Sequence, residues 1–254
     1  MKDFFEIFLL SIIQGVSEFL PVSSTAHLIL ASKIYEFENQ SLLIDISLHL
    51  GSLLAILYYF KKDIFSFKKN KNLFFKIILG TLPLIIVGYF LYSTNIIQQI
   101  RNINVIAWTT LFFGLLLYIG DKNQFWKKID SDFNVKSVLI IGFFQILALI
   151  PGVSRAGITI TAGRILGFNR TDSSKIAFYL SIPALTGASF LGIKDLFDES
   201  IDFNFLVLFG VFFSFLFSLI TIKLFMKYIK NFSLNIFVIY RIILALVLFY
   251  IIYF

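Results

Sequence analysis

The chain has 254 residues, of which 58% are hydrophobic and only 15% charged, where a soluble domain carries about 25% charged residues. With a mean hydropathy of +0.88, this composition argues against a water-facing exterior, and the absence of cysteine excludes disulfides, thiolate metal sites and a cysteine nucleophile. The net charge of +7 does not indicate nucleic-acid binding, because the lysines lie in a few loops between apolar segments, as the positive-inside rule of membrane proteins predicts.

Ten apolar segments follow one another along the chain, and we predict that each is helical. They cover about residues 4–20, 23–35, 42–60, 73–92, 104–120, 135–150, 155–167, 174–193, 203–226 and 235–254. The second and seventh are too short to cross about 30 Å of hydrocarbon, and each begins at a proline-containing polar stretch, PVSSTAH (21–27) and PGVSRAG (151–157). We therefore predict six transmembrane helices and two re-entrant helical hairpins, the hairpins formed by segments one and two and by segments six and seven.

The basic loops fix the expected sidedness of this arrangement. Most of the 22 Lys and Arg residues lie at about 61–71, 121–136, 164–175 and 223–230, and these loops share one side if the two hairpins do not cross. Ten full crossings would place the loops in the same way, so segment length rather than charge favours the hairpins. Because basic loops are cytoplasmic, we predict that both termini and the acidic loop at 194–203 lie outside. The first hairpin then enters from outside and the second from the cytoplasm.

The two halves of the chain resemble each other in sequence. A gapless alignment places Ser23 on Ser154 and Ser24 on Arg155. The halves, about 1–120 and 135–254 of one membrane domain, would each hold one hairpin and three crossings, an odd number that makes them inverted repeats. We thus predict an all-α integral membrane protein, an inverted-topology repeat of two five-segment halves. Such repeats bind ligands near the midplane at the breaks of their helices, which here are the two hairpin tips.

Three ionisable residues lie at the predicted tips: Glu18, His27 and Arg155. An ionisable side chain within a bilayer is costly unless it is paired or hydrated, so each is a candidate functional residue. Glu18 lies four residues after Gln14, and the two side chains share a face if this arm is helical. Arg241, a cation in the last apolar segment, is interpreted as a structural partner of a carbonyl or carboxylate.

The start of each returning helix is rich in hydroxyl groups. Ser23, Ser24 and Thr25 open one helix and Ser154 the other, and serine is a good helix N-cap, so Ser23 is read as either a cap or a functional residue. Two helix N-termini directed at one point present free N–H groups and positive dipole ends, and Arg155 adds a guanidinium. Together they predict an anion site, and phosphate is the guest that can use all these donors.

A phosphate buried in a membrane implies a phospholipid or an isoprenoid phosphate. Glu18 and Gln14 would face it through a divalent cation, which we expect to be Mg²⁺ or Ca²⁺. His49 and Asp45 lie one turn apart in the third segment, and they are either a pair that supports the site or a polar contact between helices.

The segments QGVSEFLPVSSTAHL (14–28) and PGVSRAGITI (151–160) resemble the undecaprenyl-diphosphatase, or bacitracin-resistance protein, family. That family has an (E/Q)xxxE element followed by Pro-x-Ser-Ser-x-x-His, and a PGxSRSxxT element in its second half. HLGSLLAI (49–56) and YLSIPALTGAS (179–189) are also similar to family segments, so the resemblance covers nearly the whole chain. Ala156 departs from the pattern, because a serine usually follows the arginine, and this puts one phosphate hydrogen bond in doubt.

The resemblance implies hydrolysis of undecaprenyl diphosphate to undecaprenyl phosphate, which returns the lipid carrier to peptidoglycan synthesis and confers bacitracin resistance. It implies a bacterial inner-membrane enzyme with a site open to the outer face, and it allows a homodimer. The expected catalytic residues are Glu18, Ser24, His27 and Arg155, and those expected to bind substrate are Gln14, Ser23, Thr25, Gly152, Ser154 and Thr159. The nucleophile is Ser24, His27 or a water; we favour Ser24, activated by an imidazole or a carboxylate.

Two other functions fit parts of the sequence. A transporter or polyprenyl-phosphate flippase shares inverted repeats and broken helices, but it needs no nucleophile. The other membrane phosphatase class, with PSGH and SRxxxxxHxxxD elements, requires histidines that this chain lacks, because its only two are His27 and His49.

Overall fold

The computed structural model describes residues 2–35, 42–65, 71–94, 96–122, 125–199 and 205–253, and within these ranges the regular structure is helical. Ten helices correspond to the ten predicted segments: α1 (Lys2–Ser17), α2 (Ser24–Tyr35), α3 (Leu42–Tyr59), α5 (Lys71–Ser93), α7 (Ile103–Asp121), α9 (Val135–Ile146), α10 (Arg155–Ile165), α11 (Arg170–Glu199), α12 (Phe205–Tyr228) and α13 (Asn235–Tyr253). Three short helices, α4 (Lys61–Phe65), α6 (Ile96–Ile100) and α8 (Ile129–Asp132), lie in predicted loops, and a 3-10 turn, η1 (Leu147–Leu149), follows α9. The all-α class is confirmed.

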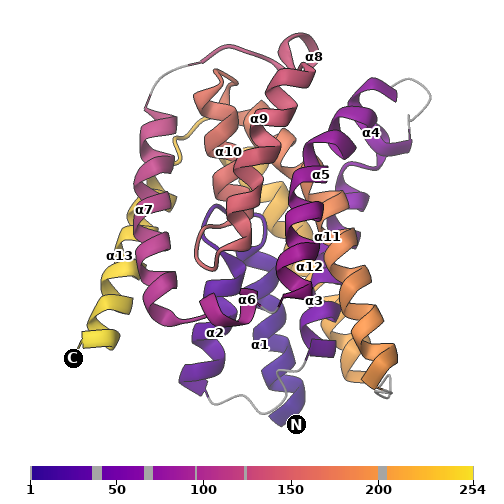
Figure 1. Ribbon diagram of the computed structural model, residues 1–254, viewed down its shortest axis with the longest axis vertical. Helices are drawn as coiled ribbons and strands as arrows, with labels where there is room; N and C mark the ends of the chain where they lie inside the picture. Colours follow the sequence, from indigo (N-terminus) through magenta and orange to yellow (C-terminus); the bar gives the residue numbers. More distant parts are fainter. Residues whose placement is uncertain are drawn as a thin grey trace.

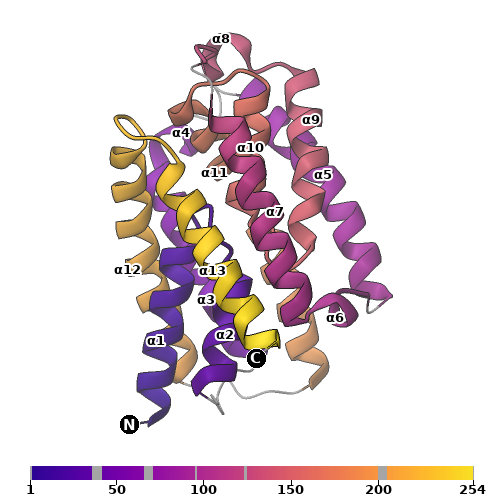
Figure 2. The ribbon, with the colours of Figure 1, turned by 90° about the vertical axis from the view of Figure 1, so that its left-hand side faces the viewer.

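Two helical hairpins enter the molecule from opposite ends (Figures 1 and 2). The outer ends of α1 and α2 lie at the end where both termini are found. At the opposite end, near α8, α9 begins and α10 ends. The connections of both hairpins lie in the interior at mid-height. This is the arrangement that segment length predicts. The division into two repeated halves stays a prediction.

Four helices, α5, α7, α12 and α13, are long and apolar enough to cross a membrane by length and composition. Large side chains such as Phe75, Trp108 and Phe212 are exposed on them, as lipid-facing positions require. α3 packs against α12 and α11. The two further crossings, which the sequence assigns to α3 and α11, stay a prediction. The chain is a multi-pass membrane protein. Positions 200–203 of the loop predicted outside lie beyond the described residues, as do positions 66–70 of the basic loop 61–71.

The hairpin tips share a feature of the backbone. Ser23 and Ser154 have φ of 80° and 70°, the only non-glycine residues with positive φ in the described part of the chain, and each immediately precedes a returning helix. These are the positions that the predicted repeat aligns. A left-handed conformation is costly for a residue with a side chain, so the surrounding contacts must hold both turns in place.

The second tip is also fixed by close packing. Gly152 has φ of 90°, and a Cβ atom there would lie 2.2 Å from Thr109 Oγ1 of α7, so only glycine fits. Ser154 caps α10 as predicted, because its Oγ accepts a hydrogen bond of 3.1 Å from the Gly157 N–H. The hydroxyl of Ser154 also lies 3.5 Å from the carbonyl oxygen of Leu20, which joins the second tip to the first.

Candidate active site

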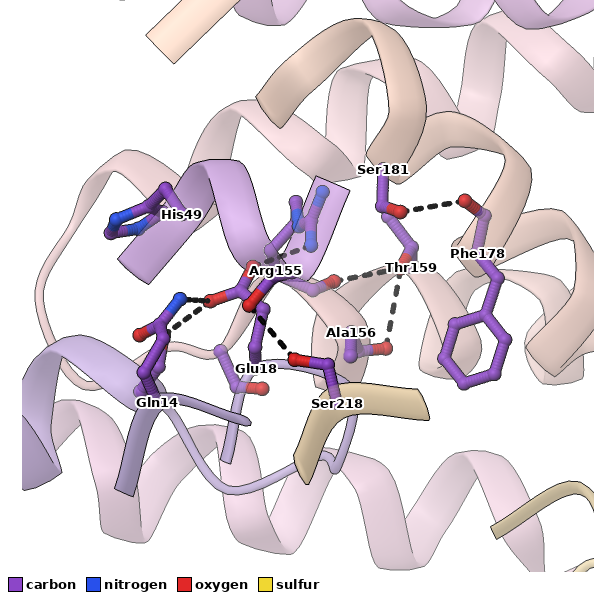
Figure 3. Close-up of polar contacts among 12 residues, drawn as sticks. Gln14, Glu18, His49, Arg155, Ala156, Thr159, Phe178, Ser181 and Ser218 are labelled. Atoms are coloured by element: carbon purple, nitrogen blue, oxygen red, sulfur yellow. Dashed lines mark hydrogen bonds and ion pairs between the residues drawn. The ribbon is translucent and has the colours of Figure 1, made fainter. Parts of the chain in front are cut away.

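The carboxylate of Glu18 is the centre of a polar cluster between the two tips (Figure 3). It lies just past α1, where its N–H still donates to the Gln14 carbonyl at 2.9 Å. The Gln14 amide donates to Oε2 at 3.0 Å, and the Ser24 hydroxyl donates to the same oxygen at 2.7 Å. Arg155 Nη2 donates to Oε1 at 2.6 Å. The structure therefore brings together four residues that the sequence singled out.

The Glu18–Arg155 ion pair is largely buried, with 6% of the Glu18 side chain and 14% of the Arg155 side chain exposed. Removing two charges from water is expensive, and further hydrogen bonds are needed to offset the cost. Glu18 has them, but Arg155 Nη1 and Gln14 Oε1 are buried without a hydrogen-bond partner. The cluster thus keeps a charged donor and a neutral oxygen acceptor for other groups.

Two helix N-termini converge on this cluster. α2 begins at Ser24 and α10 at Arg155, so their first turns present backbone N–H groups and positive dipole ends to the same region. Thr25 lies in the first turn of α2 and is half-buried. The predicted pair of helix starts is therefore present, and both starts belong to helices of more than two turns.

His27 has different partners from those we expected. Its Nδ1 lies 2.6 Å from the Ser23 carbonyl oxygen, to which it can only donate, so Nε2 of the neutral ring accepts from the Tyr240 hydroxyl. The ring also stacks on that of Tyr240, with centroids 5.6 Å apart and an interplanar angle of 12°. The group that accepts the Ser24 proton in the structure is Glu18, not His27.

The remaining candidates are held by their own surroundings. Thr159 is fully buried and donates to the carbonyls of Arg155 and Ala156, at 2.7 and 3.2 Å, so its hydroxyl proton is used inside α10 (Figure 3). His49 Nδ1 bonds the backbone carbonyl of Asp45 at 2.7 Å, which is a contact within α3 rather than a pair with the carboxylate. Tyr240 was not among the residues predicted for the site. Its one signal is its position beside Arg241, an arginine within a membrane span.

A divalent cation can be tested against these donors. The described residues hold no group of three or more His, Cys, Asp or Glu suited to a metal. Glu18 and the unpartnered Gln14 Oε1 are hard oxygen ligands on one face, and Mg²⁺ commonly takes one or two protein oxygens together with substrate phosphates. The residues therefore fit a cation that shares its ligands with a bound diphosphate.

The chain is similar to known proteins over nearly its full length. Residues 7–247 match the bacitracin resistance protein BacA family. An undecaprenyl-diphosphatase from Pelagibacter ubique (strain HTCC1062) is 55% identical over 99% of both chains. A protein of the same name from Ruegeria sp. (strain TM1040) is 37% identical, and the match covers 98% of both chains. Another from Alteromonas mediterranea is 40% identical, and the match covers 96% of this chain and 97% of the relative.

Proposed function

The chain belongs to the bacitracin resistance protein BacA family, and on that premise we propose that it hydrolyses undecaprenyl diphosphate to undecaprenyl phosphate and inorganic phosphate. The observation that carries the proposal is the Ser24–Glu18–Arg155 cluster. A hydroxyl bonded to a buried carboxylate lies beside a guanidinium that has an unused donor. We assign these groups as a nucleophile, a base and an anion-binding group.

In the proposed first step Ser24 Oγ attacks the terminal phosphorus, and Glu18 takes the hydroxyl proton. The 2.7 Å bond from Ser24 to Glu18 is the geometry that such a general base requires. The phosphoanhydride bond breaks, and its electron pair leaves with undecaprenyl phosphate. Water then attacks the phosphoserine, Glu18 returns its proton to the departing Ser24 Oγ, and the protons of the water leave on the released phosphate. The serine hydroxyl and the Glu18 carboxylate are thereby restored.

The positive groups of the site would stabilise the transferring phosphoryl group. Arg155 Nη1 is the donor left free by the pair with Glu18, and the N–H groups that open α2 and α10 add further donors in a water-poor site. Ala156 follows Arg155 without a hydroxyl and is buried. We expect this to remove one hydrogen bond to phosphate and to leave the charged groups in place.

A divalent cation, Mg²⁺ or Ca²⁺, is proposed at Glu18 and Gln14 Oε1. When bound, it would neutralise negative charge on the diphosphate. Gln14 has a second role that needs no metal, because its amide donates to Glu18 and keeps the carboxylate turned toward Ser24 and Arg155. We therefore expect Gln14→Leu to impair both cation response and turnover.

The proposed place of the enzyme is the bacterial inner membrane, with its site open to the outer face. The first hairpin, which carries Ser24 and Glu18, enters from the end that has few basic residues. Removal of the diphosphate there would recycle the lipid carrier of peptidoglycan synthesis and confer bacitracin resistance. Assembly as a homodimer is a separate prediction, which the mass of the protein in detergent tests.

The alternative function, transport or flipping of a polyprenyl phosphate, needs the anion site but not the Ser24–Glu18 bond. The decisive assay measures phosphate released by purified protein in detergent from undecaprenyl diphosphate, with and without a chelator. We expect release, and its loss in Glu18→Gln. Asp3→Asn, which removes an exposed carboxylate from α1, the helix that Glu18 follows, is the matched control and should stay active. No release by folded wild-type protein would favour transport.

A further inference from the structure

Arg241 of α13 is fully buried directly behind the two hairpin tips. A guanidinium has five N–H groups, and Arg241 makes five hydrogen bonds, all to backbone carbonyl oxygens. Nη1 donates to Pro21 at 3.3 Å and to Val153 at 3.0 Å, and Nη2 donates to Gly152 at 2.9 Å. The other two bonds, from Nε to Thr110 at 3.1 Å and from Nη2 to Thr109 at 3.4 Å, reach α7.

These acceptors explain why an arginine is needed here. Pro21, Gly152 and Val153 lie in the turns between helices, so no intrahelical N–H is aligned with their carbonyls. A buried carbonyl without a donor costs about 1–3 kcal/mol. One planar fork supplies donors to both tips at once, and a lysine ammonium, a point charge with three donors, does not match that pattern.

The charge of Arg241 is a second feature of this contact. None of the ion pairs in the described part of the chain includes Arg241. Its Nη1 lies close to the start of α10, since a Cβ atom on Gly157 would be 3.3 Å from it. The positive charge therefore remains available to the region between the helix N-termini.

We infer that Arg241 is a positioning residue for the reaction: it clamps the two hairpin tips in the register that places Ser24, Glu18 and Arg155 together. The inference rests on the proposed function. The first tip carries the nucleophile and the base, and the second carries the anion-binding guanidinium. Because Arg241 bonds the backbone of both tips, a small shift of its fork changes the distance between the reacting groups. It does not itself touch the substrate.

Replacement of Arg241 should reduce turnover more than substrate binding. A misplacement of about 1 Å can cost 10²-fold in rate, so Arg241→Gln should lower kcat by about 10²-fold with KM within about threefold. Arg241→Lys should fall nearly as far, because it keeps the charge but lacks the fork. Turnover is measured per folded protein from undecaprenyl diphosphate in detergent, with thermal unfolding as the check on folding. If Arg241→Lys keeps more than a third of the wild-type kcat, the clamp is wrong and only its charge matters.

A second variant decides the question if both Arg241 variants fail to fold. A Cβ atom on Gly114 of α7 would lie 3.1 Å from Arg241 Cβ and 3.4 Å from its Nε, so Gly114→Ala displaces the fork without removing it. Gly187→Ala is the matched control, because nothing lies within 4 Å of a Cβ atom there. We expect kcat to fall about tenfold in Gly114→Ala and to stay at the wild-type value in Gly187→Ala. Equal kcat in both variants overturns the inference, whereas absence of phosphate release by the wild-type protein overturns the proposed function instead.

Discussion

The Glu18–Arg155 pair permits a test in which two damaging substitutions partly cancel. Glu18→Gln leaves the Arg155 guanidinium buried without its carboxylate, and Arg155→Gln leaves the Glu18 carboxylate buried without its guanidinium. Removing one partner of a buried pair typically costs 3–5 kcal/mol, whereas replacing both can be nearly neutral. Because 14% of the Arg155 side chain reaches solvent, we expect the lower end, about 3 kcal/mol, for each single variant.

The stability of the double variant should differ from the sum of the two single effects. The Gln14 amide and the Ser24 hydroxyl still donate to a glutamine at position 18, so the loss is confined to the ion pair itself. We expect the double variant to lose about 1–2 kcal/mol, roughly 4 kcal/mol less than additivity gives. The measurement is unfolding of all four proteins in mixed micelles titrated with a denaturing detergent.

Unlike stability, activity should not recover in the double variant. Groups that act as one unit are not additive in rate, so losing either one already removes most of the effect. Each single variant should lose about 10²–10³-fold in kcat, the size seen when one donor to a developing oxyanion is removed, and the double variant should be no better. Additive destabilisation in the double variant would refute the pair as a buried, mutually dependent unit. Recovered activity in the double variant would refute the roles given to both residues.

Three further predictions concern the nucleophile, the histidine and the sidedness. Single turnovers with a substrate labelled in its terminal phosphate should leave an acid-stable label on Ser24, and near-normal turnover of Ser24→Ala would end the serine route. His27→Gln should lose less turnover than Glu18→Gln in the same assay, because His27 is bonded to the Tyr240 hydroxyl rather than to Ser24; an equal loss would restore it as the base. Arg101 directly follows α6 and Lys128 directly precedes α8; both are exposed, and Figure 1 shows α6 and α8 toward opposite ends. An impermeant thiol reagent added to intact cells should label Arg101→Cys and not Lys128→Cys, and the reverse labelling would show that the predicted topology is inverted.

Much of the helical arrangement follows from local sequence. Apolar segment length distinguished the hairpins from the crossing helices, and the two prolines marked the breaks. The start of α11 was missed, because Asn169 accepts a hydrogen bond of 2.9 Å from the Asp172 N–H and begins the helix at Arg170, earlier than hydropathy indicates. The short helices α4, α6 and α8 have too few residues to show a periodic pattern.

The site was predictable where burial alone makes a residue unusual. A carboxylate and a guanidinium in apolar surroundings had to be paired or functional. In the structure Arg155 Nη2 lies 2.6 Å from Glu18 Oε1. The partner of His27 was not predictable. Tyr240 is 213 positions away, and 41% of its surface is exposed, so in the sequence it resembles any aromatic residue of a lipid-facing helix. Only the packing of α13 against the first hairpin brings the two rings together.

The meeting of two hairpin tips within a single chain also determines what chemistry the site can hold. If two identical subunits had met at a two-fold axis, each group would face its own copy, and a pair of Glu18 carboxylates or of Arg155 guanidiniums would repel. Here the aligned positions after the left-handed serines differ, with a hydroxyl on one side and a cation on the other. A lipid phosphate bound between them would meet a hydroxyl on one side and a cation on the other, so in the proposed reaction the site would impose a direction on its substrate.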